Sequence, residues 1–207
     1  MPRGPFISLD GLDGTGKSTQ CRLLADLLRQ HGRTAIVCSD PGGTAVGDVL
    51  REVLLGQRHK IALPCEALLF MASRAQLVAE VIRPALAAGQ AVVADRFTLA
   101  NVVYQGHAGG LDPQLLWEAG RLATGGLEPD LTIVLDLPVE EALARRGRPA
   151  DRFESRDGDY QARVRAGFLT EARRDPQRIR VVDATASVEA VHTAIRQIVL
   201  SEIRLPK

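Results

Sequence analysis

The chain has 207 residues, of which 45% are hydrophobic and 25% charged. This composition is typical of a globular protein and excludes the fibrous, collagen-like and disordered classes. Lys and Arg together number 26 and Asp and Glu 25, so the formal net charge of +1 gives no general attraction to nucleic acids or anionic membranes. We therefore expect no nucleic-acid partner and no membrane partner.

The N-terminus and the cysteines indicate the compartment. Only a short apolar stretch precedes Asp10, far less than a signal-peptide core or the roughly 20 residues that span a membrane. Cys21, Cys38 and Cys65 are odd in number and show no CxxC spacing, so they predict neither a disulfide framework nor a zinc site. We expect a cytoplasmic protein.

Short apolar runs alternate with helical patterns along the chain, and no repeat or long linker divides them. The first strand is expected over residues 6–10, followed by a glycine-rich turn and a helix that ends at Gly32. A long helix is expected over 64–88, with a kink at Pro84. Further strands are expected over 34–38, 91–94, 131–135 and 179–182. This alternation predicts a single α/β domain over 1–207, a five-stranded parallel sheet covered by helices on both faces, with ligands at the carboxyl ends of the strands.

Residues 11–18, GLDGTGKS, match the pattern GxxxxGK[ST] in full. Between a strand and a helix, such a P-loop turns consecutive backbone N–H groups toward the phosphates of a nucleotide. Lys17 would reach the β and γ phosphates, and the Ser18 hydroxyl would ligate Mg²⁺. GTPases are disfavoured, because no Lys follows an Asn as their guanine-reading NKxD requires. The residues expected to bind the triphosphate are Gly11, Leu12, Asp13, Gly14, Thr15, Gly16, Lys17, Ser18 and Thr19.

Asp95 and Arg96 directly follow the strand expected at 91–94, which places them at the ligand-binding edge of the sheet. Asp95 can hold Mg²⁺ through water, and Arg96 can clamp an acceptor phosphate so that two anions approach each other. An ordinary strand-end ion pair is the alternative that stays open. Asp136 also ends a strand, but we prefer Asp95 for the metal and interpret Asp136 as a turn residue before Pro138.

Four stretches resemble the thymidylate kinase family, and the resemblance extends along essentially the whole chain. They are GLDGTGKST at 11–19, PGGT at 41–44, FMASR at 70–74 and DRFTLANVVYQG at 95–106, the last close to the family signature DR[YFH]xxSxxAYQ. Ala100 and Val103 depart from that signature, which has Ser and Ala at these positions. The resemblance implies a P-loop NTPase fold with a mobile lid, a homodimer, and transfer of the γ-phosphate of ATP to dTMP, giving dTDP and ADP in dTTP synthesis.

The resemblance also implies an acceptor site. Phe70 would stack on the thymine, and Arg74, one helical turn later, would reach a base carbonyl. Asn101 and Gln105 would meet the pyrimidine edge, and Tyr104 would crowd the sugar 2′ position and so favour deoxyribose. The alternative is that these side chains only pack or cap their helices. The full dTMP set is Asp13, Asp40, Arg51, Phe70, Arg74, Arg96, Asn101, Tyr104 and Gln105.

We expect two acids and two arginines near the acceptor phosphate. Asp13 resembles the family carboxylate that faces the acceptor's sugar and phosphate, and Asp40 replaces the Glu of the family's REPGGT stretch. Ser39 stands where that stretch has its Arg, so we expect Arg96 to hold the acceptor phosphate. Arg51 is a weaker candidate and can equally be a surface residue.

Residues 145–158 resemble the closing lid of the family and are rich in Arg. Arg148 and Arg152 would cover the transferred phosphoryl group, and Arg146 would stack on the adenine of ATP. Some members have Arg at the position of Gly14, and those that lack it use lid arginines for the same charge. We interpret Arg156, Arg163 and Arg165 as solvated surface residues. The expected catalytic set is Asp13, Lys17, Asp95, Arg96, Arg148 and Arg152, and the expected metal ligands are Ser18 and Asp95.

Two other functions stay open. A kinase of the same architecture could act on AMP, CMP or dCMP, although Phe70, Arg74 and Tyr104 favour a pyrimidine deoxynucleotide. A non-catalytic protein could instead use ATP as a switch for a partner. It would bind ATP without releasing ADP when a monophosphate is added.

Overall fold

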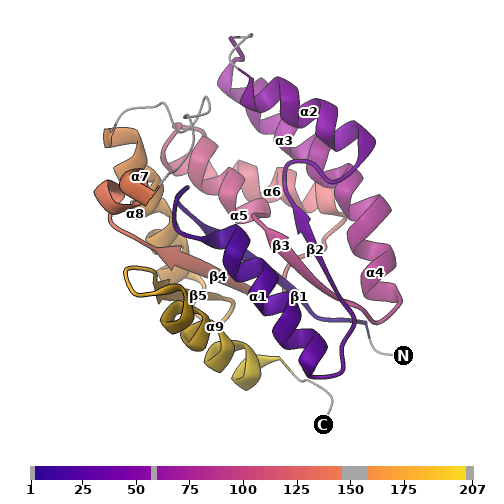
Figure 1. The fold of residues 1–207 in the computed structure, drawn as a ribbon. Coiled ribbons are helices and arrows are strands. Elements are labelled where there is room, and N and C mark those ends of the chain that lie inside the picture. Colours follow the sequence, from indigo (N-terminus) through magenta and orange to yellow (C-terminus); the bar gives the residue numbers. More distant parts are fainter. Residues whose placement is uncertain (1–2, 57–59, 146–157, 204–207) are drawn as a thin grey trace.

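Five strands form one sheet in the order β2-β3-β1-β4-β5, and all four pairings are parallel (Figure 1). The structure is a computed structural model and describes residues 3–56, 60–145 and 158–203. The strands are β1 (Phe6–Gly11), β2 (Ala35–Ser39), β3 (Ala91–Asp95), β4 (Leu131–Asp136) and β5 (Ile179–Asp183). The predicted five-stranded parallel sheet is confirmed, and each strand lies within one residue of its expected range.

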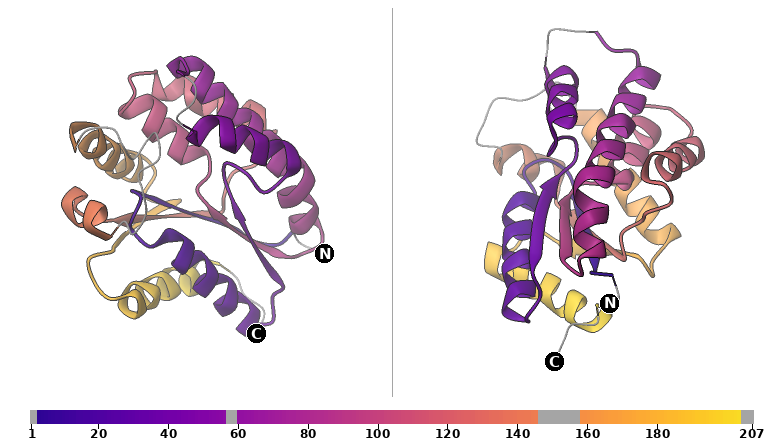
Figure 2. Two further views of the ribbon diagram at one scale, coloured as in Figure 1. Left: turned by 45° about the horizontal axis from the view of Figure 1, so that its top comes forward. Right: turned by 90° about the vertical axis from the view of Figure 1, so that its right-hand side faces the viewer.

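Helices connect the strands and cover both faces of the sheet. They are α1 (Lys17–Gln30), α2 (Ala45–Leu55), α3 (Leu63–Leu77), η1 (Val78–Ile82), α4 (Arg83–Ala87), α5 (Thr98–Asn101), η2 (Val102–His107), α6 (Pro113–Thr124), α7 (Val139–Arg145), α8 (Gly158–Arg174) and α9 (Val188–Glu202). The left view of Figure 2 shows α1 and α9 on one side of the sheet and the helices α3, α4, α5 and α6 on the other. None of the helices in the described ranges is long and apolar enough to cross a membrane.

The alternation of side chains along β1 divides the core between these two faces. Leu9 joins the cluster that contains Leu24 of α1 and Ile195 of α9. Phe6 points to the opposite face, where it meets Phe97 edge to face with the ring centroids 4.9 Å apart. β1 therefore packs on both faces, and all six of its residues are buried, including the polar Ser8 and Asp10.

The strand order puts a topological switch point beside β1. The chain passes from β1 to β2 on one side of the sheet and later from β3 to β4 on the other, so β1 lies between β3 and β4. In open parallel sheets, ligands bind in the crevice at such a point, beyond the carboxyl ends of the strands. The P-loop follows β1 directly and therefore opens into this crevice.

The helix expected over 64–88 is continuous in path but not uniform. α3 leads through the π-helical turn η1 into α4, where Pro84 is the second residue. Proline has no N–H to donate, and its ring crowds the carbonyl of the residue four positions earlier, here Glu80. The wider π turn is centred on Glu80, so the predicted irregularity lies one turn before the proline.

Candidate active site

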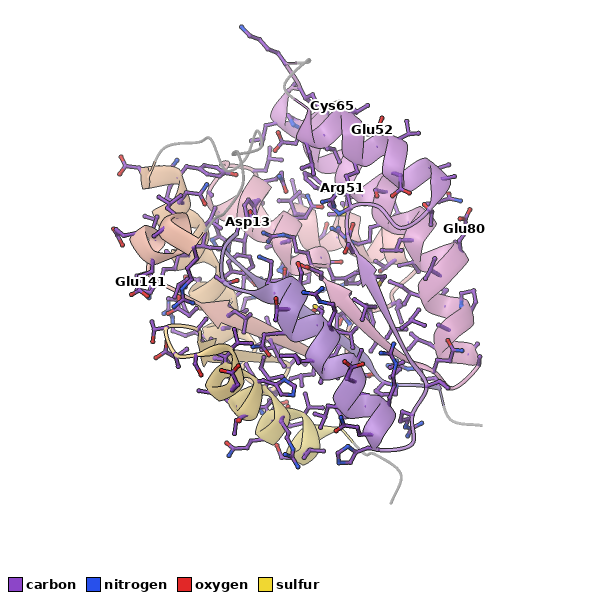
Figure 3. The ribbon with its side chains drawn as sticks, viewed as in Figure 1. Asp13, Arg51, Glu52, Cys65, Glu80 and Glu141 are labelled. Atoms are coloured by element: carbon purple, nitrogen blue, oxygen red, sulfur yellow. The ribbon has the colours of Figure 1, made fainter. Side chains whose placement is uncertain are left out.

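A cavity of about 580 Å³ lies beyond the carboxyl ends of β1, β2 and β3. Asp13 of the P-loop and Arg51 of α2 flank it from opposite sides (Figure 3). The predicted site residues that line it are Asp13, Gly14, Gly16, Lys17, Ser18, Thr19, Asp40, Arg51, Phe70, Arg74, Asp95, Arg96, Asn101, Tyr104 and Gln105. Gly11, Leu12 and Thr15 were predicted with them and belong to the same loop, but they do not line the cavity.

The P-loop is shaped by its glycines. Gly14 and Gly16 have φ angles of 88° and 89°, which L-residues with side chains rarely adopt, and Gly16 precedes the first turn of α1. The Thr15 hydroxyl donates to the Leu12 carbonyl at 2.9 Å and so closes the loop on itself. The first residues of α1 line the cavity, and the N–H groups at a helix N-terminus favour a phosphate there.

Lys17 folds back over the loop. Its Nζ donates to the Leu12 carbonyl at 2.7 Å and lies 3.6 Å from Oδ1 of Asp13. Burial lowers the pKa of the Lys17 ammonium below its ordinary value, and the neighbouring Arg96 guanidinium lowers it further. Lys17 is thus a buried cation at the mouth of the P-loop.

Arg96 lines the cavity, and three contacts hold its guanidinium between the P-loop and Tyr104. Nη1 donates to the Gly11 carbonyl at 3.0 Å, and Nη2 donates to Oδ1 of Asp13 at 2.7 Å and to the Tyr104 hydroxyl at 3.1 Å. Its φ of 72° is the only positive value of a non-glycine residue in the described ranges. Such a conformation costs energy and persists where the surroundings require it, often at functional sites.

Ser18 and Asp95 meet beside the P-loop, as predicted for a pair of metal ligands. The Ser18 hydroxyl donates to Oδ2 of Asp95 at 2.5 Å, and both residues line the cavity. A hydroxyl and a carboxylate are oxygen donors of the kind that Mg²⁺ prefers. The described part of the chain has no cluster of three or more His, Cys, Asp or Glu residues able to hold a metal.

A run of buried polar side chains forms the wall opposite the P-loop. Arg74 is 1% exposed, and its Nε donates to Oδ2 of Asp40 at 2.5 Å. Its Nη1 donates to Oδ1 of Asn101 at 3.0 Å, and Nδ2 of Asn101 donates to Oε1 of Gln105 at 2.9 Å. Nε2 of Gln105 in turn donates to Oε1 of Glu66 at 2.9 Å. Arg74, which we expected to reach a base carbonyl, therefore also joins Asp40 to Asn101.

The remaining acceptor residues are placed around this wall. Phe70 is half-buried on α3 and lines the cavity, and Nη1 of Arg51 donates to the Pro41 carbonyl at 2.6 Å. Burial raises the pKa of Asp40, although the Arg74 guanidinium opposes this shift. Burial likewise raises the pKa of the Tyr104 hydroxyl, which therefore stays a neutral donor and acceptor beside Arg96.

The lid prediction falls largely beyond the described residues. Arg146, Arg148, Arg152 and Arg156 lie outside them. Arg145, the last residue of α7, was not predicted as a site residue, yet it lines the cavity. Its guanidinium donates to the carbonyls of Ala184 and Thr185 at 2.6 and 2.9 Å.

The interpretation of Asp136 and Arg165 as a turn residue and a solvated cation was wrong. Nε and Nη2 of Arg165 donate to the two carboxylate oxygens of Asp136 at 2.7 and 2.8 Å. This bidentate pair joins α8 to the end of β4, and neither residue lines the cavity. The two residues are 29 positions apart, so no local pattern connects them.

Two buried acids were missed. Glu66 is 1% exposed and lies behind Gln105, as described above. Asp10 is fully buried near the end of β1, and neither of its carboxylate oxygens has a hydrogen-bond partner among the described residues. Burial raises the pKa of Asp10 to about 7, against the opposing charges of Arg96 and Lys17. The sequence could have indicated Asp10, because it is an acid near the end of an apolar strand. Nothing in the sequence around Glu66 indicated that it is buried.

Comparison with known proteins identifies the family. A family model described as thymidylate kinase matches residues 9–195. The chain belongs to the thymidylate kinase family. The thymidylate kinase of Rhodopirellula baltica is 48% identical over 197 residues, which cover 95% of this chain and 80% of that relative. The thymidylate kinase of Symbiobacterium thermophilum is 47% identical over 196 residues, 94% of this chain and 92% of the relative.

A solved structure agrees with the sequence comparison. The crystal structure of a thymidylate kinase from Ehrlichia chaffeensis matches with a TM-score of 0.78 and 28% identity, covering 96% of this chain and 99% of the other. Membership of the thymidylate kinase family makes the chain a kinase, that is, a phosphotransferase that uses ATP. The family, the fold class and the activity predicted from the motifs are thereby confirmed.

Proposed function

We propose that this cavity transfers the γ-phosphate of ATP to dTMP, giving dTDP and ADP. The proposal rests on one observation: a single cavity is lined by different kinds of residues at its two ends. The P-loop and Lys17 supply a phosphate site at one end, and Phe70 with the polar wall supplies a site for a base at the other. Arg96 lies between them, where the two phosphates must meet.

The reaction needs little covalent chemistry from the protein. The attacking oxygen of a monophosphate is already anionic near neutral pH, so positioning and charge neutralisation provide the catalysis. In the proposed role, Arg96 binds the acceptor phosphate and Asp13 holds the guanidinium in place. Lys17 neutralises charge on the β and γ phosphates, and its buried position strengthens this interaction.

Ser18 and Asp95 fit a magnesium ion bound together with the nucleotide. Mg²⁺ is commonly held by one or two protein oxygen ligands, with phosphates and waters completing its shell. The hydroxyl and carboxylate that meet at 2.5 Å provide such a pair next to the P-loop. A bound Mg²⁺ would supply positive charge to the phosphate oxygens.

Tyr104 supports selection of a deoxyribose. Its ring lies against the Arg96 guanidinium, with the guanidinium carbon 4.9 Å from the ring centroid, and Phe168 meets it edge to face with the ring centroids 6.1 Å apart. A closely packed ring with these two neighbours resists displacement by an extra hydroxyl. Arg146, Arg148 and Arg152 stay predictions for the lid, and the cytoplasmic location also stays a prediction.

Exposed apolar side chains on three adjoining helices support the proposed homodimer. They are Val46 and Val49 on α2, Leu68 on α3, and Leu115 and Leu122 on α6. α3 packs against both α2 and α6, so the three helices adjoin one another. Exposed apolar side chains on adjoining helices are candidates for an interaction surface. Light scattering should give the mass of a dimer, and Leu68→Glu should shift it toward that of a monomer.

The activity is tested by a substrate panel. The protein is incubated with ATP, Mg²⁺ and each of dTMP, dCMP, CMP and AMP, and the release of ADP is measured. We expect dTMP to give the highest kcat/KM. Preference for another monophosphate would replace dTMP by that acceptor, whereas ATP binding without any monophosphate-dependent ADP release would support the switch protein instead.

A further inference from the structure

Four side chains form a continuous hydrogen-bonded run behind and along the acceptor end of the cavity. Arg74 donates to Asn101, Asn101 donates to Gln105, and Gln105 donates to Glu66. We call these four residues the amide run. Each is at most 2% exposed, and all but Glu66 line the cavity. The run is therefore part of the wall that a bound base would face.

The two ends of the amide run have fixed and opposite polarity. An Arg guanidinium can only donate hydrogen bonds, and a carboxylate can only accept them. An amide presents an oxygen or an NH₂ group according to which way it is turned. Asn101 must therefore turn its oxygen to Arg74, and Gln105 must turn its NH₂ to Glu66, as the distances of 3.0 and 2.9 Å record.

We propose that Glu66 is a positioning residue for base selection, which acts through Gln105 to keep the Asn101 amide in the orientation that accepts thymine and rejects cytosine. This inference rests on the proposed function, because it concerns which pyrimidine the same cavity binds. Glu66 does not line the cavity, so it acts through its neighbour and not by contact with the substrate.

The polarity of the run matches the edge of one type of base. Arg74 offers N–H groups beside the oxygen of Asn101. Thymine carries a carbonyl oxygen next to a ring N–H, so its acceptor and donor meet the donor and acceptor of the wall. Cytosine carries an amino group next to an unprotonated ring nitrogen, which is the reverse pattern. A wall built to hydrogen-bond one pattern discriminates strongly against its reverse.

Cytosine could be accommodated only if Asn101 turned its NH₂ group toward the base. That turn breaks the contact with Arg74 and brings the Asn101 oxygen to the oxygen of Gln105. Gln105 could relieve the second conflict by turning too, but its oxygen would then face the Glu66 carboxylate. Two buried acceptors in contact are unfavourable, so Glu66 blocks the concerted turn of both amides.

The Glu66→Gln variant should remove this block. A Gln at this position can offer an NH₂ group as well as an oxygen, so both amides can turn together and only Arg74 still opposes them. We expect the ratio of kcat/KM for dTMP to kcat/KM for dCMP to fall by about tenfold, the effect of one charged hydrogen bond. The turnover number with saturating dTMP should change little, because Glu66 touches neither phosphate site.

Glu171→Gln is the matched control. Glu171 is also a buried acid, 3% exposed, but it bonds His107 and Trp117 and does not line the cavity. Its substitution should leave the dTMP to dCMP ratio unchanged. An unchanged ratio in Glu66→Gln, or an equal fall in Glu171→Gln, would overturn the proposal.

A charge-swapped variant tests the polarity itself. In Glu66→Gln/Gln105→Glu the carboxylate moves next to Asn101 and again can only accept from it, so the dTMP preference should return toward the original ratio. If Glu66→Gln does not fold, as judged by its melting curve, Gln105→Met cuts the run and should lower the ratio in its place. Failure of both expectations would refute the role of Glu66.

The measurements separate this inference from the function that it rests on. If the unaltered protein phosphorylates dTMP but Glu66→Gln keeps its selectivity, only the inference fails. If the unaltered protein releases no ADP with dTMP, the proposed function fails before any variant is made.

Discussion

Replacing Asp10 with Asn tests the charge buried beneath the P-loop. Asp10 lies in β1, and its carboxylate has no hydrogen-bond partner among the described residues. The charged groups around it are Arg96, Lys17, Asp95 and Arg74. Removal of the ionisable carboxyl at nearly constant volume isolates what its ionisation costs the folded protein.

The expected magnitude follows from the pKa of this carboxyl, which burial raises from 3.8 to about 7. The folded protein holds this proton more tightly than the unfolded chain, so stability is full below the lower value and falls as pH rises toward the upper one. One unit of pKa corresponds to about 1.4 kcal/mol, which makes the complete loss about 4 kcal/mol. Of this, about 3 kcal/mol is lost between about pH 5 and about pH 8.5.

The assay is urea unfolding of both proteins at these two pH values. Asn has no proton to lose, so the free energy of unfolding of Asp10→Asn, minus that of the unaltered protein, should rise by about 3 kcal/mol from the lower to the higher pH. A change in this difference does not depend on how well the Asn amide fits. The surrounding charged groups contribute to the free energy of unfolding of both proteins, so their contributions largely cancel in the difference.

Asp183→Asn is the control for this experiment. The Thr185 backbone N–H donates to Asp183 and lowers its pKa, so this acid is ionised in both the folded and unfolded states throughout the range. Its substitution should leave the difference constant. If the Asp10→Asn difference is also constant between the two pH values, Asp10 is not a buried carboxyl with a raised pKa, and the reasoning is refuted.

Three further predictions concern the two ends of the cavity. Lys17→Ala should lower turnover by about 10³-fold in a coupled ADP assay, because a cation at the transferred phosphate is lost; near-normal turnover would remove Lys17 from the mechanism. Phe70→Ala should raise the KM for dTMP more than it lowers kcat, and a fall in kcat alone would contradict base stacking. A Cβ at Gly14 would lie 2.1 Å from the Ala142 carbonyl oxygen, whereas one at Gly16 would meet nothing within 4 Å, although both residues have positive φ. Gly14→Ala should therefore lower the melting temperature by several degrees more than Gly16→Ala. Equal changes in melting temperature would show that α7 moves away from residue 14 at little cost.

The contact at Gly14 also bears on a comparison within the family. The Arg that the family resemblance implies at this position in some members would not fit here, because α7 approaches Gly14 too closely for any side chain without movement. The charge that such an Arg would supply must then come from elsewhere in this chain. Arg145 at the end of α7 lines the cavity, and it is the first residue of the predicted lid.

The strands and the P-loop were predictable because their signals are local. A short apolar run between helices defines a buried parallel strand, and the glycines of residues 11–16 specify positive φ angles through their own stereochemistry. The switch point beside β1 then follows from topology, and with it the position of the cavity. Even Arg96 was placed correctly at the strand end, although its positive φ has no sequence signal.

The polar wall could not be predicted in the same way. Its contacts join residues 34, 27 and 39 positions apart, and the residues give no common pattern along the chain. Arg74 on a helix is indistinguishable from a surface cation until Asp40 is found opposite it. The pair of Arg165 and Asp136 was misread for this reason, since whether a charge is solvated or paired depends on what folding brings beside it.

Three positively charged side chains of the cavity are paired with carboxylates of the same protein. These pairs explain how so many charges are tolerated in one place. Asp13 accepts from Arg96 and lies 3.6 Å from Lys17, so one carboxylate serves the two cations assigned to phosphates. Arg74 is paired separately with Asp40 on the far wall. A buried cation without a partner would lose its proton or unfold the protein, whereas a shared carboxylate holds both groups charged and in position. Phosphate binding can then exchange these contacts for stronger ones without first ordering the side chains, which is the advantage of a preorganised site.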